Sequence, residues 1–401
     1  MLRRFATKRV ECAQMAKSIL LILNTELSLT RQIFHGISEY SRTRPDWDLR
    51  LISFRADQPV PDPAAEGAAG AIGHVVDAAA ALALSAGPVP WVNVSNYPYT
   101  PQWPVVTNDD ERVGACAAEA LLERGFRHFA YAMRPWSGRS FMLRGLGFMR
   151  AVESGGGSWH CYPSAMTTTL NGQSPQTVPA DMGQWLTSLP KPLAVLACND
   201  DWGEQVIDQC QAHGLAVPEE VAVIGVDNDD IRCELAPVPL SSIALGARRI
   251  GYEAASLLDR LMSGQVRAAD ARPIFIAPSG VVTRRSSDVL AVNDPDVAAA
   301  VRFIGARAGE PTGVDDVVDA VTVSRRVLER RFRDALRRSV HDEIQRVHVA
   351  RARQLLAETG LSLPAIAKAS GFASRERMGV TFRQLTGQTP AAYRKRHATR
   401  G

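Results

Sequence analysis

Two different hydrophobic patterns divide the chain near residue 290. Up to about residue 285, short apolar runs alternate with longer amphipathic stretches. In the stretch at residues 30–42, Ile33, Phe34, Ile37 and Tyr40 lie one, three and four positions apart, a spacing that predicts a helix. The short apolar runs predict buried strands at residues 18–24, 47–54, 70–75, 89–94, 127–132, 193–198 and 221–226.

This alternation predicts the architecture of the first part of the chain. Strands that alternate with helices favour right-handed βαβ units, in which helices cover both faces of a parallel sheet. Residues 18–285 form a stretch of this kind that is long enough for two similar α/β lobes. We therefore predict a two-lobed α/β domain over these residues.

A change of texture marks the end of that domain. Residues 283–295 are polar and end in Pro295, which predicts a boundary with a linker at residues 286–295. Beyond it the apolar spacing is helical, as at Val314, Val317, Val318 and Val321. Residues 296–401 are therefore predicted to be an all-α domain.

Two segments of this all-α domain repeat one layout, which predicts two helix-turn-helix units. The first has helices at residues 314–320 and 324–333, and the second at residues 363–370 and 374–383. Gly371 suits a left-handed turn position in the second unit. The helix predicted between the units spans about 27 Å, close to the 34 Å between successive major grooves on one face of DNA.

Charge is distributed unevenly between the two parts. The whole chain has 46 Lys+Arg and 42 Asp+Glu, a formal charge of +4. Residues 302–401 hold 20 Lys+Arg and 10 Asp+Glu, a formal charge of +10, which leaves −6 for residues 1–301. A basic end on an acidic body favours contact with a polyanion such as DNA.

The C-terminal residues resemble a known DNA-binding family. The segment from Gly371 to Arg383 and the closing Thr386 to Arg394 are similar to the AraC-type DNA-binding domain. The resemblance implies groove-facing residues at Ser324, Arg325, Arg326, Glu329, Arg330, Ser374, Arg375, Glu376 and Val380. Val380 would meet DNA with an apolar group, as a thymine methyl allows. The alternative for the arginines is a solvated helix face, and Leu328, Phe332, Met378 and Phe382 are assigned to the core.

Polar residues follow the predicted strands of the first domain. Asn24 ends the first strand, Asn199 and Asp200 follow residues 193–198, and Asp227 follows residues 221–226. Arg144 lies early in the helix after residues 127–133. Ligand sites of open α/β sheets lie at these carboxyl ends, and carboxylate, amide and guanidinium groups suit a polyhydroxylated ligand. Each strand-end residue alone has a simpler interpretation as a turn former.

The same residues carry a second resemblance. The segments at residues 197–200, 217–228, 144–148 and 239–243 resemble the periplasmic-binding-protein-like ligand domain of LacI-type regulators. In that family, residues matching Asp227, Asn199 and Arg144 bind sugar hydroxyls. A sugar domain followed by an AraC-type domain resembles the bacterial xylose-operon regulators over nearly the whole chain. The resemblance implies D-xylose or a related pentose as the sugar. Thr30 stands where those regulators have an acidic residue beside the cleft, so a hexose or other polyol stays an alternative.

These patterns favour a sugar-responsive transcription regulator that is not an enzyme. Its expected partners are operator DNA and a small sugar, with RNA polymerase as a further possible one, and the family resemblance implies a homodimer. A free sugar-binding protein would have no use for the basic tail, and an α/β enzyme would need a phosphate-binding loop or an acid/base pair, neither of which is visible. The six scattered cysteines and the short apolar run at residues 19–23 favour a cytoplasmic, reduced protein without cofactor, metal or membrane span.

Overall fold

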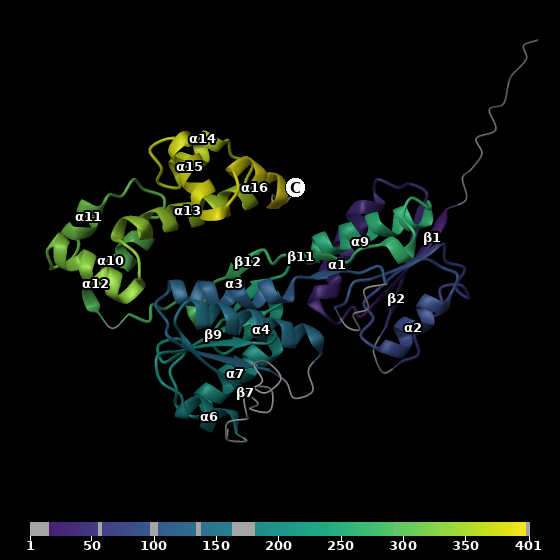
Figure 1. The fold of residues 1–401 in the computed structure, drawn as a ribbon, viewed down its shortest axis with the longest axis horizontal. Helices are drawn as coiled ribbons and strands as arrows, with labels where there is room; N and C mark the ends of the chain where they lie inside the picture. The colour runs from purple at the N-terminus through teal and green to yellow at the C-terminus, as the bar shows by residue number, and fades with distance from the viewer. Residues whose placement is uncertain are drawn as a thin grey trace, which may run out of the picture. The chain divides into compact units, whose positions relative to one another are not determined.

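The computed structural model describes residues 16–54, 58–96, 103–133, 138–162, 181–292 and 294–397. Contacts divide the chain into two compact units (Figure 1). The second unit comprises Asp288–Gly401 together with two short segments from earlier in the chain, Ala120–His128 and Lys191–Leu193. The sequence patterns did not indicate that these two segments pack with the C-terminal unit.

The first lobe of the first unit is built on a four-stranded parallel sheet of order β2-β1-β3-β4. Its elements are β1 (Lys17–Leu23), α1 (Ser28–Ser41), β2 (Trp47–Ser53), β3 (Gly70–Gly73), α2 (Ala78–Ala86), β4 (Trp91–Asn93) and α9 (Ala247–Met262). Strand β1 sends Ile19 and Leu21 to the core under α1 and α9, and Leu20 and Ile22 to the core under α2. A strand buried on both faces reads as a continuous apolar run, which is why the sequence predicted it.

Close packing of α1 on α9 depends on two glycines. A Cβ at Gly36 would overlap the carbonyl oxygen of Arg248, and one at Gly251 would overlap that of Ile33. The two helices therefore approach backbone to backbone. This contact joins residues that are about 200 positions apart into one lobe.

The second lobe is built on a six-stranded sheet of order β12-β10-β9-β8-β6-β7, with β12 antiparallel to β10. Its elements are α3 (Asp110–Glu123), β6 (His128–Ala132), α4 (Arg139–Ser154), β7 (Ser158–Tyr162), α6 (Met182–Ser188), β8 (Leu193–Ala197), α7 (Asp200–Ala212), β9 (Val221–Val226), α8 (Asp230–Leu235), β10 (Ser241–Ala244) and β12 (Gly280–Val282). Two short strands, β5 (Val106–Asn108) and β11 (Ile274–Ile276), pair in parallel by themselves. Single helical turns lie at η1 (Ala268–Asp270) and η2 (Arg285–Ser287). The predicted two-lobed α/β architecture is confirmed.

The C-terminal unit is all-helical over its described part from α10 onward, as predicted. Its helices are α10 (Pro295–Ala306), α11 (Val314–Asp319), α12 (Arg325–Leu336), α13 (Val340–Glu358), α14 (Leu363–Ala369), α15 (Arg375–Thr386) and α16 (Pro390–His397). Helix α13 lies between two groups of helices in Figure 1 and belongs to two separate cores. Its first half packs with α10, α11 and α12, and its second half packs with α14, α15 and α16.

The helix-turn-helix units have the expected turns. Gly371 takes a left-handed φ of 77° between α14 and α15. The four residues assigned to the core, Leu328, Phe332, Met378 and Phe382, are completely buried. The serines that precede the two recognition helices differ in their hydrogen bonds. The Ser374 hydroxyl caps α15 by accepting a hydrogen bond from the backbone N–H of Arg377 at 3.3 Å. Ser324 precedes α12 without a side-chain cap hydrogen bond.

The remaining expectations concern the cysteines, membrane-spanning helices and metal sites. No disulfide bond joins the cysteines of the described residues, and Cys161, Cys198, Cys210 and Cys233 are buried, while Cys12 lies outside those residues. Within the described ranges no helix is long and apolar enough to cross a membrane. The same ranges contain no group of three or more His, Cys, Asp or Glu side chains arranged to hold a metal ion.

Candidate functional site

Arg144 lies at the centre of a buried cluster of charged groups in the second lobe. The side chain projects from the second turn of α4 and the residue is 3% exposed. Its Nε donates to Asp110 Oδ1 at 2.9 Å, its Nη1 donates to the carbonyl oxygen of Cys198 at 2.6 Å, and its Nη2 lies 3.8 Å from Asp227 Oδ1. Burial disfavours the charge, but the Asp110 and Asp227 carboxylates raise the pKa of Arg144 above its ordinary value. The guanidinium is therefore charged and fixed in one orientation.

Asp110 was not among the residues predicted from the sequence. It begins α3, and its second carboxylate oxygen accepts a hydrogen bond from Asn96 Nδ2 at 2.8 Å. Two glycines bring α3 and α4 close enough for this contact, since a Cβ at Gly114 or Gly147 would overlap a backbone carbonyl of the other helix. The only sequence signal was a run of polar residues, Asn108 to Asp110, at the end of a three-residue strand.

Asp227 follows β9 and faces Arg144. Its backbone has a φ of 110° and that of Asn228 a φ of 49°, conformations that are uncommon for residues other than glycine. Such residues cost about 1–3 kcal/mol each and persist only where the surroundings hold them. The Asp227 side chain is 26% exposed. Burial raises the pKa of Asp227 to about 6, against the opposing effect of Arg144.

Asp200 supports the loop that carries Asp227. Its Oδ1 accepts a hydrogen bond from Ser242 Oγ at 2.5 Å, and its Oδ2 accepts one from the backbone N–H of Asp229 at 2.7 Å. The residue is 2% exposed, and burial together with the charge of Asp227 raises the pKa of Asp200 to about 7. Both carboxylate oxygens are thus engaged by the protein.

The amides of the predicted set also have local roles. Asn199 Oδ1 caps α7 by accepting from the backbone N–H of Trp202 at 3.0 Å. Asn24 Oδ1 accepts from the backbone N–H of Glu26 at 3.0 Å in the loop after β1. Thr30 is buried, and its hydroxyl donates to the backbone carbonyls of Asn24 and Leu27. The residue that departs from the family pattern therefore stabilises the loop after β1.

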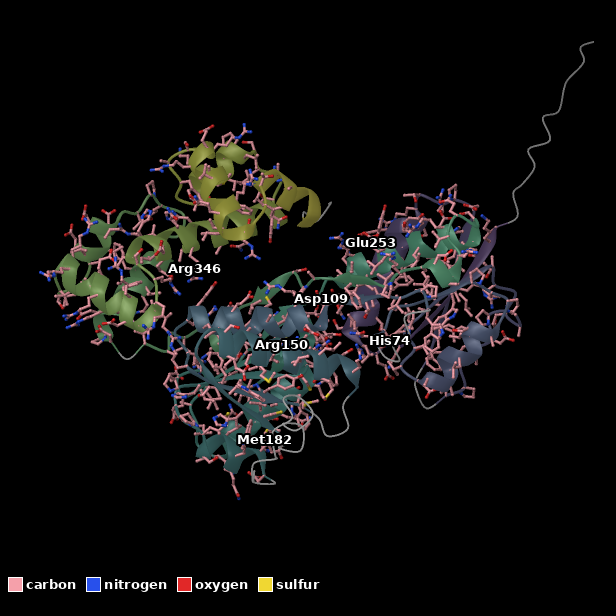
Figure 2. The ribbon with its side chains drawn as sticks, in the orientation of Figure 1. His74, Asp109, Arg150, Met182, Glu253 and Arg346 are labelled. Atoms are coloured by element: carbon pink, nitrogen blue, oxygen red, sulfur yellow. The ribbon has the colours of Figure 1, made fainter. Side chains whose placement is uncertain are left out.

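One ion pair joins the edges of the two lobes. Arg31 of α1 lies 3.9 Å from Asp229, which follows the strained residues after β9. His74, labelled in Figure 2, follows β3 at the same end of the first sheet, and burial lowers its pKa to about 4. The polar residues therefore gather at the carboxyl ends of the strands, where parallel sheets place their ligand sites.

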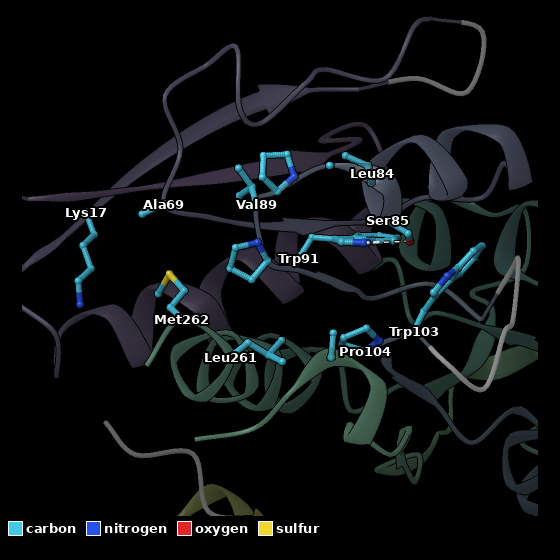
Figure 3. Close-up of a pocket in the computed structure, with 14 residues that line it drawn as sticks. Lys17, Ala69, Leu84, Ser85, Val89, Trp91, Trp103, Pro104, Leu261 and Met262 are labelled. Atoms are coloured by element: carbon cyan, nitrogen blue, oxygen red, sulfur yellow. Dashed lines mark hydrogen bonds between the residues drawn. The ribbon is translucent and has the colours of Figure 1, made fainter. Parts of the chain in front are cut away.

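A cavity of about 700 Å³ lies elsewhere in the first lobe (Figure 3). Lys17 begins β1, Trp91 begins β4 and Ala69 precedes β3, and all three line the cavity. These are the amino ends of the strands, whereas Asn24 and Asn96 follow their carboxyl ends. The cavity is therefore distinct from the polar cluster.

The predicted base-reading residues lie at the starts of α12 and α15. Ser324, Arg325, Arg326 and Arg330 are exposed, and Arg325 Nη1 is 2.9 Å from Asp315 Oδ1. Arg375 and Glu376 are exposed, and Val380 is 59% exposed. Ser374 is half-buried because it caps α15.

Glu329 differs from its predicted neighbours. Its side chain is 21% exposed, and its Oε2 is buried without a hydrogen-bond partner among the described residues. Arg333 is the nearest cation, with Nη2 at 3.8 Å. The carboxylate is therefore partly withdrawn from the surface on which Arg326 and Arg330 are exposed.

Family models match both parts of the chain. A periplasmic binding protein-like domain matches residues 118–287, and a helix-turn-helix domain matches residues 317–396. The chain is 31% identical over 385 residues to the xylose operon regulatory protein of Escherichia coli strain K12, covering 94% of this chain and 96% of that protein. It is 30% identical to the protein of the same name from Haemophilus influenzae, covering 74% and 76%.

Solved structures show the same division. A structure described as the xylose-binding transcription activator xylR is 29% identical, covers 95% of this chain and 98% of its own, and has a TM-score of 0.58. A LacI family transcriptional regulator from Enterococcus faecium with bound ribose is 18% identical, covers 68% of this chain and 98% of its own, and has a TM-score of 0.51. The latter supports only the fold of the first unit.

Proposed function

The chain belongs to the family of the xylose operon regulatory proteins, and we propose on that premise that D-xylose or a related pentose is its effector. It is a sugar-sensing, DNA-binding transcription regulator and not an enzyme. The observation that carries the effector proposal is the pair formed by Arg144 and Asp227 at the carboxyl end of β9. A fixed guanidinium beside a partly exposed carboxylate offers donors and acceptors together, as sugar hydroxyls require.

We assign different tasks to the five polar residues predicted for this site. Arg144, Asp227, Asn199 and Asn24 are proposed to contact the sugar. Asp200 is proposed to act through Asp229 and Ser242, because its own oxygens already accept hydrogen bonds from them. Asp110 keeps Arg144 oriented through the 2.9 Å bond to Nε.

A thermal-shift screen tests the effector. The full chain is heated with pentoses and hexoses, and a sugar that binds the folded state raises the unfolding midpoint by mass action. D-Xylose should give a clear rise that Arg144→Gln abolishes. Arg150→Gln is the matched control, because Arg150 (labelled in Figure 2) lies on the same helix. Its side chain is 61% exposed. A rise with a hexose only would replace the pentose proposal, and no rise with any sugar would overturn it.

The C-terminal unit is proposed to read two successive major grooves with α12 and α15. Arg325, Arg326, Arg330, Arg375, Glu376 and Val380 are the proposed base-reading residues, with Ser324, Ser374 and Glu329 at the edge of that surface. Helix α13, at about 28 Å for its 19 residues, spaces the two units. A homodimer and contact with RNA polymerase are part of the proposal, and sedimentation of the full chain with and without sugar tests the former.

Arg326→Ala tests the recognition-helix assignment. Loss of a base contact should relax base preference at one position and cost about 1–3 kcal/mol of binding free energy. Arg333→Ala is the control, since Arg333 lies on the same helix, is 68% exposed and falls outside the proposed set. Mobility shifts on operator variants at two salt concentrations measure both. Unchanged specificity in Arg326→Ala would contradict the assignment.

A further inference from the structure

A single arginine near the end of the first unit contacts the loop that presents Asp227. Arg284 Nη1 donates to Asn228 Oδ1 at 2.9 Å and to the carbonyl oxygen of Leu240 at 3.1 Å. Its Nε donates to Glu234 Oε1, on α8, at 2.7 Å. The guanidinium fork thus ties the loop after β9 and the following helix to the start of β10.

The loop needs such support because of its backbone. Asp227 and Asn228 are consecutive residues with positive φ, and neither is glycine. Three backbone N–H groups are held by the same surroundings: Asp227 N donates to Ile243 O, Asn228 N to Ser242 Oγ and Asp229 N to Asp200 Oδ2. Among the described residues, Arg284 supplies the one hydrogen bond that the Asn228 side chain makes. Asn228 is the residue that directly follows the proposed sugar contact.

Arg284 is itself firmly placed. Its backbone N–H donates to Ser241 Oγ, and its carbonyl oxygen accepts from the same hydroxyl, both at 2.8 Å. Ser286 Oγ donates to Val223 O at 2.7 Å on β9. Buried serines therefore fix the segment that carries Arg284 to β9 and β10, and the side chain, only 14% exposed, has a rigid base.

We propose that Arg284 is a positioning residue for effector binding, which holds the loop of residues 227–229 in the conformation that aims the Asp227 carboxylate at Arg144. This inference deepens the proposed function and rests on it. Arg284 acts through Asn228 and does not touch the sugar. Asp200 holds the same loop from the side of α7, so the loop is supported at two points.

The test is a double-mutant cycle in the full chain. Sugar affinity is measured by calorimetry for wild type, Arg284→Gln, Asn228→Gly and the double variant, with D-xylose and the sugars of the thermal-shift screen as probes. Loss of a hydrogen bond from a charged group should weaken binding about tenfold in Arg284→Gln. Glycine accepts a positive φ freely and removes the acceptor, so Arg284→Gln should have less than about a threefold effect in the Asn228→Gly background.

Controls separate positioning from general destabilisation. Arg285→Gln removes an exposed arginine from the same segment and should leave affinity unchanged. Arg284→Lys keeps the charge facing Glu234 but lacks the fork, and should fold with intermediate affinity. Additive effects of the two substitutions, or wild-type affinity in Arg284→Gln, would overturn the inference alone. Failure of wild type to bind any sugar would overturn the proposed function and this inference together.

Discussion

Asp200 and Asp227 are two carboxyl groups that share one buried region beside Arg144. Burial raises the pKa of Asp200 to about 7, with a further rise from the charge of Asp227, and burial raises the pKa of Asp227 to about 6 against the opposing effect of Arg144. The folded state therefore holds these protons more tightly than the unfolded chain does. The resulting stability is present below about pH 4 and is lost as the pH rises through 6 to 7.

Asp200→Asn isolates this effect. Asparagine stays neutral at every pH, so the variant should lose less stability between pH 5 and pH 8 than wild type does. Thermal unfolding midpoints of the full chain at the two pH values measure the difference. Asp201→Asn is the matched control, on the neighbouring position of α7. Equal pH dependence in wild type and Asp200→Asn would show that the Asp200 carboxyl is not titrating in this range.

Helices α3 and α4 cross where each has a glycine, and this crossing sets the distance between Asp110 and Arg144. Gly114→Ala would place a methyl group on the carbonyl oxygen of Arg144. We expect it to push the helices apart, to cost about 1–3 kcal/mol of stability by overpacking, and to weaken sugar binding by misplacing Arg144.

Calorimetry and thermal unfolding of Gly114→Ala check both effects. Gly138→Ala is the control, because a Cβ there meets no atom within 4 Å at the start of α4. Wild-type sugar affinity in Gly114→Ala would mean that the crossing does not set the geometry of Arg144.

The rotation along helix α13 sets how the two helix-turn-helix units face DNA relative to each other. Val347 packs in the first core of the C-terminal unit and Val349 in the second. One alanine inserted between residues 347 and 348 turns everything after it by about 100° and advances it by about 1.5 Å. The two recognition helices could then no longer face one side of DNA.

The expected result is a loss of at least about tenfold in affinity for a bipartite operator, because the second unit no longer adds to binding of the first. Affinity for a single half-site should change little. One alanine inserted after the exposed Asp288 is the control for chain length. Mobility shifts on full and half operators measure both, and an unchanged full-operator affinity would exclude a rigid spacer role for α13.

Several strands that the sequence predicted are fully buried and leave a continuous apolar pattern. Residues 221–226 are all buried and were placed to the residue as β9. Strands β5 and β11 are three residues long and form only by pairing with each other across the chain, so no local pattern marks them. In the candidate site, the partners of two hydrogen bonds are likewise far apart in the sequence. Asp110 and Arg144 are separated by 34 positions, and Arg284 and Asn228 by 56, so no local pattern indicates these contacts. Strand-end residues could be proposed from the sequence because their position alone is informative.

At the scale of the whole molecule, charge and function are separated along the chain. The first 301 residues carry −6 and the last 100 carry +10. The acidic sensor adds nothing to phosphate binding, so the salt dependence of operator affinity should come from the C-terminal residues. Sugar can alter DNA binding only through its different affinity for two arrangements of the protein.

Helix α13 also limits how such regulators can be recombined. Helix α13 contributes to the cores of both helix-turn-helix units. A gene fusion joined at either end of α13 therefore exposes apolar side chains that are buried in the intact protein. The segment Ala120–His128 packs with the same unit, where Arg346 of α13 meets Glu123 at 2.9 Å. An exchange of operator specificity between two such regulators therefore has to transfer both helix-turn-helix units together. The segment Ala120–His128 of the recipient must then match the transferred units.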